Sequence, residues 1–145
     1  MKKFTRIICV MLALVMALAC FSGCKSGDTQ TGSDGSTGTS TIKIGGIGPT
    51  TGKAALYGQA VKNAAEIAVE EINAKDSSVK FELKFEDDEN DPEKSINAYN
   101  TLKDWGMQIL CGTVTTQPCI AVSSEANNDK IFTLTPSASS TDVIG

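Results

Sequence analysis

Residues 79–106 read VKFELKFEDDENDPEKSINAYNTLKDWG, and their hydrophobic period changes once along this stretch. From residue 79 to residue 86 apolar and charged side chains alternate strictly, which predicts an edge strand with one face in water. From Asp91 the apolar residues recur every three or four positions. This period predicts a helix with Asp91 as its N-cap, Pro92 at its first position and Gly106 at its end. The stretch is therefore expected to be one strand and one helix joined by an acidic loop.

The same order of strand and helix continues on both sides of this stretch. Short apolar runs and helical periodicity predict three more strands, at residues 42–47, 108–111 and 131–134, and two more helices, at residues 61–72 and 118–126. The order β-α-β-α-β-α-β with short connections predicts an α/β fold, a doubly wound (flavodoxin-like) parallel sheet with helices on both faces. No helix is predicted after the last strand, so we expect residues 41–145 to be an incomplete lobe and the chain to be a fragment.

The first residues have the composition of a secretory signal. Lys2, Lys3 and Arg6 precede fifteen consecutive apolar residues at positions 7–21. This run is shorter than the ~18–20 residues that a membrane-spanning helix needs. A basic start, a short apolar run and small residues before a cleavage point therefore predict a signal peptide over residues 1–23.

Cys24 is the expected site of lipid attachment. Residues 21–24, Phe-Ser-Gly-Cys, resemble a bacterial lipobox, although that motif prefers Leu in the place of Phe, and residues 17–20 give a competing frame that ends at Cys20. Residues 25–41 favour Cys24, because 13 of these 17 residues are Gly, Ser or Thr and none is apolar. Residues 24–40 are thus predicted to be a lipidated Cys with a flexible tether at the outer face of the cytoplasmic membrane, on the cell surface or in the periplasm. Plain signal-peptidase cleavage without lipidation is the alternative.

Composition excludes several classes of function. The chain has 13 Lys and Arg against 17 Asp and Glu and no His, and its single Arg is Arg6. The body of the protein therefore lacks a His general base, His metal ligands and guanidinium groups that could clamp phosphate. An acidic body also lacks the basic patch of a nucleic-acid-binding protein. We accordingly expect no enzyme activity, no cofactor, no metal and no nucleic-acid partner.

Three motifs with known chemistry are incomplete. Residues 47–54 lack the first Gly and the Ser or Thr of a phosphate-binding P-loop. The acidic run 86–91 is followed by neither the Gly nor the Glu of a calcium loop, so we expect a solvated loop whose carboxylates face a helix N-terminus. Cys111 and Cys119 lack metal-ligand spacing; we expect two small buried residues, with a disulfide as the alternative.

Hydroxyl side chains gather where the predicted strands end, at residues 48–52, 112–116 and 135–140. Ligands of doubly wound sheets bind at the carboxyl ends of the strands, and helix N-termini bind anions there without Arg. These segments therefore indicate a site for a small carboxylate held by hydroxyls and backbone amides. Ser and Thr also form turns, and a plain turn role is the alternative.

These segments also resemble one known family, the leucine/isoleucine/valine-binding receptors of ABC importers, which are type I periplasmic binding proteins. The similar segments are GPTTG at 48–52, YG at 57–58, EEINA at 70–74, DD with DP at 87–92, GTVTT at 112–116 and TPSAS at 135–139. The resemblance covers residues 41–145 and implies the first part of the N-terminal lobe of a two-lobe protein.

The resemblance also implies roles for individual residues. Thr116 matches the family's hydroxyl residue that binds the ligand carboxylate, and Ser137 and Ser139 match positions that add backbone and hydroxyl contacts to the same group. Tyr57 matches an aromatic residue that lines the cleft, with simple packing at a helix start as the alternative. Some members have a disulfide from the acidic loop to the third strand, but this loop has no Cys, so Cys111 lacks that partner.

The function that the resemblance implies is that of an extracytoplasmic substrate-binding lipoprotein. It would close two lobes around a branched-chain or other small amino acid, or a similar carboxylate, and deliver this ligand to the ABC permease in the membrane. A ligand-sensing lobe for a signalling system and an enzyme of the flavodoxin-like fold are the alternatives. The ligand's side chain stays open, and urea, amides and aromatic acids are further candidates, because relatives of this fold bind them.

Overall fold

The computed structural model describes residues 40–144. The predicted signal peptide, Cys24 and nearly all of the predicted tether lie outside the described residues. The elements follow in the order β1 (Ser40–Gly48), α2 (Ala55–Asn73), β2 (Val79–Asp87), α3 (Pro92–Trp105), β3 (Ile109–Gly112), α4 (Thr116–Asp129), β4 (Phe132–Leu134) and the short 3₁₀ turn η1 (Thr141–Val143).

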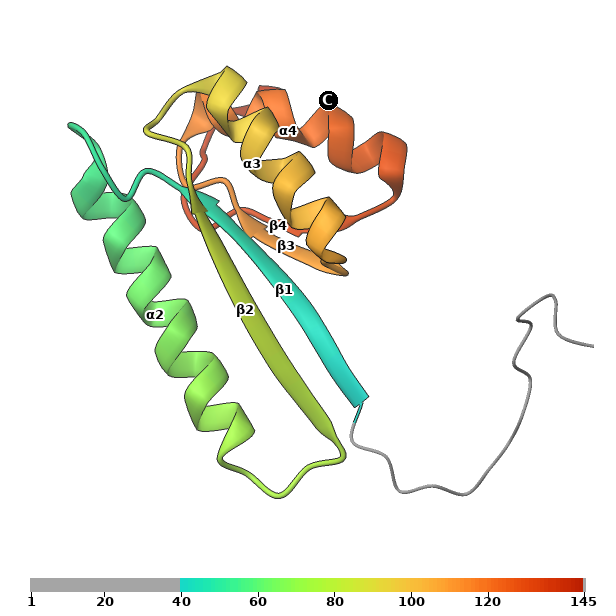
Figure 1. Ribbon diagram of the computed structural model, residues 1–145. Coiled ribbons are helices and arrows are strands. Elements are labelled where there is room, and N and C mark those ends of the chain that lie inside the picture. Colours follow the sequence, from blue (N-terminus) through green and yellow to red (C-terminus); the bar gives the residue numbers. More distant parts are fainter. Residues whose placement is uncertain (1–39, 145) are drawn as a thin grey trace, which may run out of the picture. The chain divides into compact units, whose positions relative to one another are not determined.

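The four strands form one parallel sheet in the order β2-β1-β3-β4. The chain steps from β1 to β2 in one direction, and then from β2 past β1 to β3 and on to β4 in the other. Because crossovers of parallel strands are right-handed, this reversal puts α2 on one face of the sheet and α3 and α4 on the other (Figure 1). The predicted doubly wound α/β fold is confirmed, and β2 is an edge strand as predicted.

The best-packed layer lies between the sheet and helices α3 and α4. Its fully buried side chains include Ile47 of β1, Leu102 of α3, Leu110 of β3 and Val122 of α4. Tyr99 is buried in the same layer, and its hydroxyl donates to Asp129 Oδ2 at 2.9 Å. This core fixes α4, and with it the segment that joins β3 to α4.

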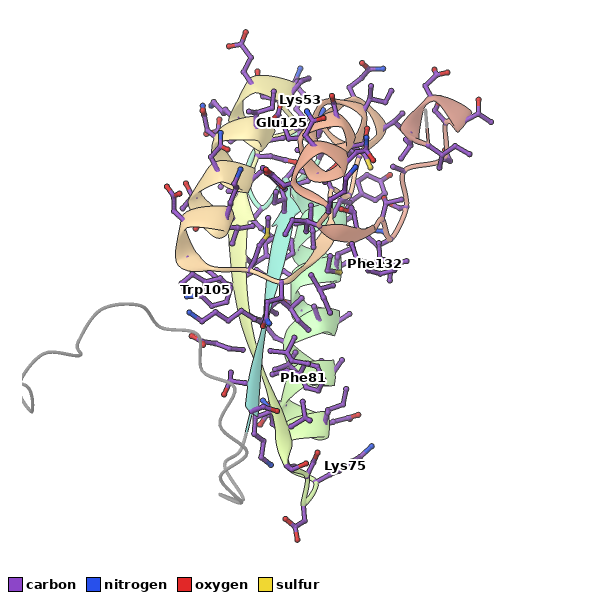
Figure 2. All side chains as sticks on the ribbon, turned by 90° about the vertical axis from the view of Figure 1, so that its right-hand side faces the viewer. Lys53, Lys75, Phe81, Trp105, Glu125 and Phe132 are labelled. Atoms are coloured by element: carbon purple, nitrogen blue, oxygen red, sulfur yellow. The ribbon has the colours of Figure 1, made fainter. Side chains whose placement is uncertain are left out.

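On the other face of the sheet the structure differs from a prediction of the sequence. The apolar residues at positions 61, 64, 65, 68, 69 and 72 recur at helical spacing and predict one buried stripe on the helix. Three residues of this stripe, Val61, Ala65 and Val69, are half-buried, whereas the other three, Ala64, Ala68 and Ile72, are exposed. Among the described elements, helix α2 packs mainly on β1 and β2, and Figure 2 shows Phe81 of β2 on its side of the sheet and Trp105 on the opposite side. Helical periodicity shows which side of a helix is apolar, but it does not show how much of that side a second layer covers.

The boundaries of α3 agree with the predicted capping residues. Asp91 accepts hydrogen bonds from Glu93 N at 2.9 Å and Lys94 N at 3.0 Å, and Gly106 ends the helix in the left-handed conformation with φ 89°. Cys119 is buried as predicted, whereas Cys111 is half-buried, and both are free thiols. Within residues 40–144 no helix is long and apolar enough to cross a membrane.

The acidic loop is only partly solvated, which corrects the expectation for residues 86–91. Asp88 is completely buried; its Oδ1 accepts from Asn90 N at 2.8 Å, and its Oδ2 lies 3.3 Å from the hydroxyl of Ser95. Burial raises the pKa of Asp88 above its ordinary value, and the hydrogen bonds from Asn90 and Ser95 act in the opposite direction. One carboxylate of the loop, that of Asp88, is thus buried against the first turn of α3.

Because the pKa of Asp88 is raised, its ionised form is disfavoured in the folded state. Asp88→Asn removes the buried charge and keeps an oxygen for the Asn90 N–H, so we expect the free energy of unfolding at pH 7 to stay within about 0.5 kcal/mol or to rise. Asp88→Ala leaves that N–H unpaired and should lose about 1–3 kcal/mol. Urea denaturation of both variants of the full-length protein measures their free energies of unfolding. Equal losses in the two variants would contradict the conclusion that the buried charge itself does not stabilise the fold.

Candidate functional site

A hollow of about 370 Å³ lies at the carboxyl ends of the strands, where the segments that follow β1, β3 and β4 meet. Its lining residues come from all three segments: Tyr57, Val114, Thr115, Thr116 and Ser137. The sheet order reverses between β1 and β3, and the crevice beside such a switch point is where doubly wound sheets bind ligands. The hollow is therefore in the position that the topology favours for a site.

Three of the four ligand-binding residues predicted from the sequence line this hollow. Tyr57 comes from the first turn of α2, Thr116 is the first residue of α4, and Ser137 follows β4. Ser139 is exposed and is not among the lining residues. Their roles in binding stay predictions, but side chains 80 residues apart in sequence are brought to one place.

The first turn of α4 supplies unpaired donors. Thr115 is the N-cap residue, yet its side chain caps nothing. The Thr115 Oγ1 atom is buried without a hydrogen-bond partner in the described part of the chain. The N–H groups in a helix's first turn have no partner within the helix, and the helix dipole gives this end a partial positive charge. A hydroxyl and backbone amides at one helix end can bind an anion together.

Thr115 was not among the residues predicted from the sequence. Its neighbour Thr116 was chosen because it matches a family position, whereas an N-cap hydroxyl normally bonds its own helix and gives no reason to suspect a ligand. The missing cap bond is visible only in three dimensions.

Two hydroxyls near the hollow hold the loops together. Thr135 Oγ1 donates to Thr113 O at 2.8 Å and accepts from Ala138 N at 3.1 Å, and Ser137 Oγ donates to Val114 O. The segment after β4 is thereby fixed to the segment after β3. Since the proton of Ser137 points to a backbone carbonyl, this hydroxyl can offer a ligand only its oxygen, and its contribution as a donor must come from the backbone.

Tyr57 lines the hollow from the first turn of α2. Its side chain is 66% exposed although it stands in the first turn of a helix, so packing within the described residues does not explain it. A large aromatic side chain with one open face beside donors is suited to cover a ligand that enters the hollow.

No charged side chain of residues 40–144 lines the hollow. The described residues also hold no cluster of His, Cys, Asp or Glu that could bind a metal ion. An anion in this place would be held by neutral hydroxyls, amides and the dipole of α4. This arrangement suits one small carboxylate better than a phosphate ester, which proteins usually bind with Arg or Lys.

A larger hollow of about 590 Å³ lies beside α4, β4 and η1, with Asn127, Phe132 and Ile144 among its lining residues. Phe132 is the first residue of β4, so this hollow lies toward the amino ends of the strands. Doubly wound sheets bind their ligands at the opposite ends, which makes the smaller hollow the better candidate.

Comparison with protein families decides the class of protein to which this fold belongs. A family model described as periplasmic binding protein matches residues 41–144. The chain belongs to the periplasmic binding protein family. Members of this family bind solutes and are not enzymes, so the alternative of an enzyme on a flavodoxin-like fold is discarded.

Two curated proteins are similar to this chain over about the same number of residues as the family model. A Leu/Ile/Val-binding protein homolog 3 from Brucella melitensis is 38% identical over 105 residues. The Leu/Ile/Val-binding protein BraC3 from Rhizobium johnstonii is 36% identical over 104 residues. The matched part is 70% of this chain and 28% of each relative.

Solved structures of periplasmic binding proteins match the fold. LivJ from Streptococcus pneumoniae, a branched-chain amino acid transporter substrate-binding protein in complex with isoleucine, has a TM-score of 0.67 and 25% identity over 71% of this chain and 30% of its own. A solute-binding protein of an ABC transporter from Rhodopseudomonas palustris, in complex with p-hydroxybenzoic acid, has a TM-score of 0.64 and 26% identity over 71% of this chain and 28% of its own. The sheet and helices described above thus correspond to part of one lobe of such proteins.

Proposed function

We propose that the full-length protein is the substrate-binding component of an ABC importer and binds a small carboxylate between two lobes. The observation that carries the proposal is the donor-rich hollow at the N-terminus of α4, which no charged side chain of residues 40–144 lines. Thr115 is one of its lining residues, and the Oγ1 of Thr115 is buried without a hydrogen-bond partner among the described residues. Isoleucine and p-hydroxybenzoic acid differ in every other respect, but both present a carboxylate. A first-lobe site for this shared group, with the rest of the ligand recognised elsewhere, accounts for both.

In this proposal Thr116 donates its hydroxyl and its N–H to the carboxylate. Ser137 and Ser139 add backbone donors and the Ser139 hydroxyl. Tyr57 covers the ligand's apolar part. No cation takes part, so the attraction rests on short charge-assisted hydrogen bonds in a partly desolvated place.

A thermal-shift screen of the full-length protein tests the proposal. Branched-chain and other small amino acids, and benzoates with ring substituents, should include at least one compound that raises the melting temperature, since a ligand that binds only the folded state stabilises it. Urea and neutral amides serve as the control set. A shift caused by the control set alone, with no effect of any carboxylate, would contradict the proposal.

We further propose that the protein is a lipoprotein, with a signal peptide over residues 1–23, a lipid on Cys24 and a tether to the domain that begins with β1 at Ser40. A soluble lobe on a lipid anchor stays beside its permease without crossing the membrane.

Cys24→Ser should abolish labelling by a fatty-acid probe and release the protein from the membrane fraction, because the thiol that carries the lipid is missing. Cys20→Ser should leave both unchanged. Metabolic labelling and cell fractionation of the two variants provide the comparison. Loss of labelling in Cys20→Ser alone would mean that the competing frame is the one cleaved.

A further inference from the structure

The loop of residues 49–54 carries the chain from β1 to the helix on which Tyr57 stands. The start of this helix has no side-chain cap, because its N-cap residue is Ala54, and its first turn has no acidic residue. Its local support is two turn bonds, from Ala55 N to Gly52 O at 3.3 Å and from Tyr57 N to Ala54 O at 3.0 Å. A helix end without a cap frays unless other contacts hold it. Since these turn bonds only tie the helix start to residues 52–54, the position of Tyr57 beside the hollow also depends on contacts that hold this loop from outside.

Asp87 provides this support from the neighbouring strand. It is the last residue of β2 and pairs in register with Gly48 of β1. Its Oδ1 accepts from Thr50 N at 2.8 Å and from Thr51 N at 3.4 Å, and its Oδ2 accepts from Thr51 Oγ1 at 2.5 Å. A fourth bond, from Glu89 N at 2.9 Å, holds the carboxylate within its own loop.

Helix α2 also holds this loop, through a hydrogen bond and a close backbone contact. Gln59 Nε2 donates to Thr50 O at 2.9 Å, so the N–H of Thr50 is bound to β2 and its carbonyl to α2. The backbone of Gly58 is buried against Pro49. A chain of direct contacts thus leads from Asp87 through Thr50 to the turn of α2 that bears Tyr57.

The Asp87 carboxylate is suited to this task because it stays ionised. Partial burial acts to raise its pKa, but the hydrogen bonds from the Thr51 hydroxyl and from the N–H groups of Glu89, Thr50 and Thr51 outweigh that effect and lower it. Hydrogen bonds to a charged acceptor are stronger than those between neutral groups.

We infer that Asp87 is a positioning residue for ligand binding, which fixes the loop of residues 49–54 and so holds Tyr57 over the hollow without touching the ligand itself. This inference rests on the proposed function. It gives one member of the acidic run 86–91 a task in binding, where the sequence suggested only a solvated loop.

The test compares Asp87→Ala with a matched control, Asp91→Ala, in the full-length protein. Asp91 lies in the loop that follows β2, and its carboxylate accepts two backbone N–H bonds where that of Asp87 accepts three. Asp91 caps α3, and no residue of α3 lines the hollow. Two measurements are made: calorimetric titration with L-isoleucine and with p-hydroxybenzoic acid, and amide hydrogen exchange without ligand.

Asp87→Ala should raise hydrogen exchange across residues 49–57 and weaken binding of the probe that the wild type binds by about tenfold. Asp91→Ala should raise exchange only at the start of α3 and leave the dissociation constant within about twofold. In a Tyr57→Ala background, Asp87→Ala should weaken binding by less than about threefold, because residues that act through one another are not additive. If Asp87 only stabilised the fold, the losses of binding free energy in Asp87→Ala and Tyr57→Ala would add fully in the double variant.

Unchanged exchange in residues 49–57, or affinity equal to that of the wild type, would overturn the role of Asp87. If the wild type bound neither probe while exchange in the loop still rose in Asp87→Ala, the proposed carboxylate site would be overturned and Asp87 would be only a structural tie. Asp87→Asn keeps an acceptor oxygen for the Thr50 N–H, so it should fold normally and retain most of the affinity. This variant therefore distinguishes an effect of losing the hydrogen bonds to the loop from an effect of misfolding.

Discussion

Replacing Thr116 with alanine in the full-length protein is expected to weaken binding of the ligand carboxylate by about 10- to 150-fold. Thr116 is the first residue of α4 and lines a hollow in which the described part of the chain places no charged side chain. The carboxylate must then be held by a few hydroxyl and amide donors. A hydrogen bond to a charged group contributes roughly 1.5–3 kcal/mol, which corresponds to the stated factor. Isothermal titration calorimetry of the variant measures it.

Thr50→Ala is the matched control, since it removes the same atoms from an equally hydroxyl-rich loop. Thr50 acts through its backbone, whose N–H bonds Asp87 and whose carbonyl bonds Gln59. Loss of its hydroxyl should therefore change binding by less than about 0.5 kcal/mol.

Ser139→Ala tests the position that the hollow does not reach. The resemblance assigns it a second bond to the same carboxylate, so its loss should approach that of Thr116→Ala. Equal, small losses in Thr116→Ala, Ser139→Ala and Thr50→Ala would mean that these hydroxyls only form turns.

Gly58→Ala is expected to lower the free energy of unfolding by about 1–3 kcal/mol, the usual penalty for overpacking. Helix propensity alone predicts the opposite sign, because Ala is favoured over Gly inside a helix by about 0.5–1 kcal/mol. The contact is what reverses the sign: a Cβ on Gly58 would lie 2.0 Å from Pro49 O and 2.5 Å from Pro49 C. Backbone atoms cannot move aside as a flexible side chain can, so α2 must shift away from the loop.

The control for urea denaturation of Gly58→Ala is Ala60→Gly, since Ala60 is exposed and lies two residues further in the same helix. Ala60→Gly should lose about 0.5–1 kcal/mol from propensity alone. A gain in stability for Gly58→Ala would contradict the close packing of α2 on Pro49. That result would also mean that the contact between Gly58 and Pro49 does not help to position Tyr57.

The strand and helix in residues 79–106 could be predicted closely because their signals are local. The alternation of β2 and the caps of α3 at Asp91 and Gly106 are each contained in a few neighbouring residues. The start of α2 was predicted at residue 61 but lies at Ala55. Residues 55–60 have no apolar period and no capping residue, and the turn is held instead by Gly58 and Gln59 against the β1–α2 loop. Tertiary contacts of this kind leave no sequence pattern.

The candidate site was predictable in outline for a different reason. Parallel strands bring their carboxyl ends to one edge, so hydroxyls that follow β3 and β4 were expected to meet, and Thr116 and Ser137 do line one hollow. The unpartnered hydroxyl of Thr115 and the tie from Asp87 to Thr50 depend on side-chain directions across elements. Residue types and spacing contain no information about these directions.

The central claim, that the hollow holds a ligand's carboxylate, is tested most directly by titrating acids and their amides into the full-length protein. L-Isoleucine is compared with L-isoleucinamide, and p-hydroxybenzoic acid with p-hydroxybenzamide, by calorimetry under one set of conditions. For whichever pair binds, the acid should bind at least about tenfold more tightly than the amide, because the amide loses the charge and brings donors to a site built of donors. An amide that binds as tightly as its acid would contradict the claim that the hollow holds the ligand's carboxylate.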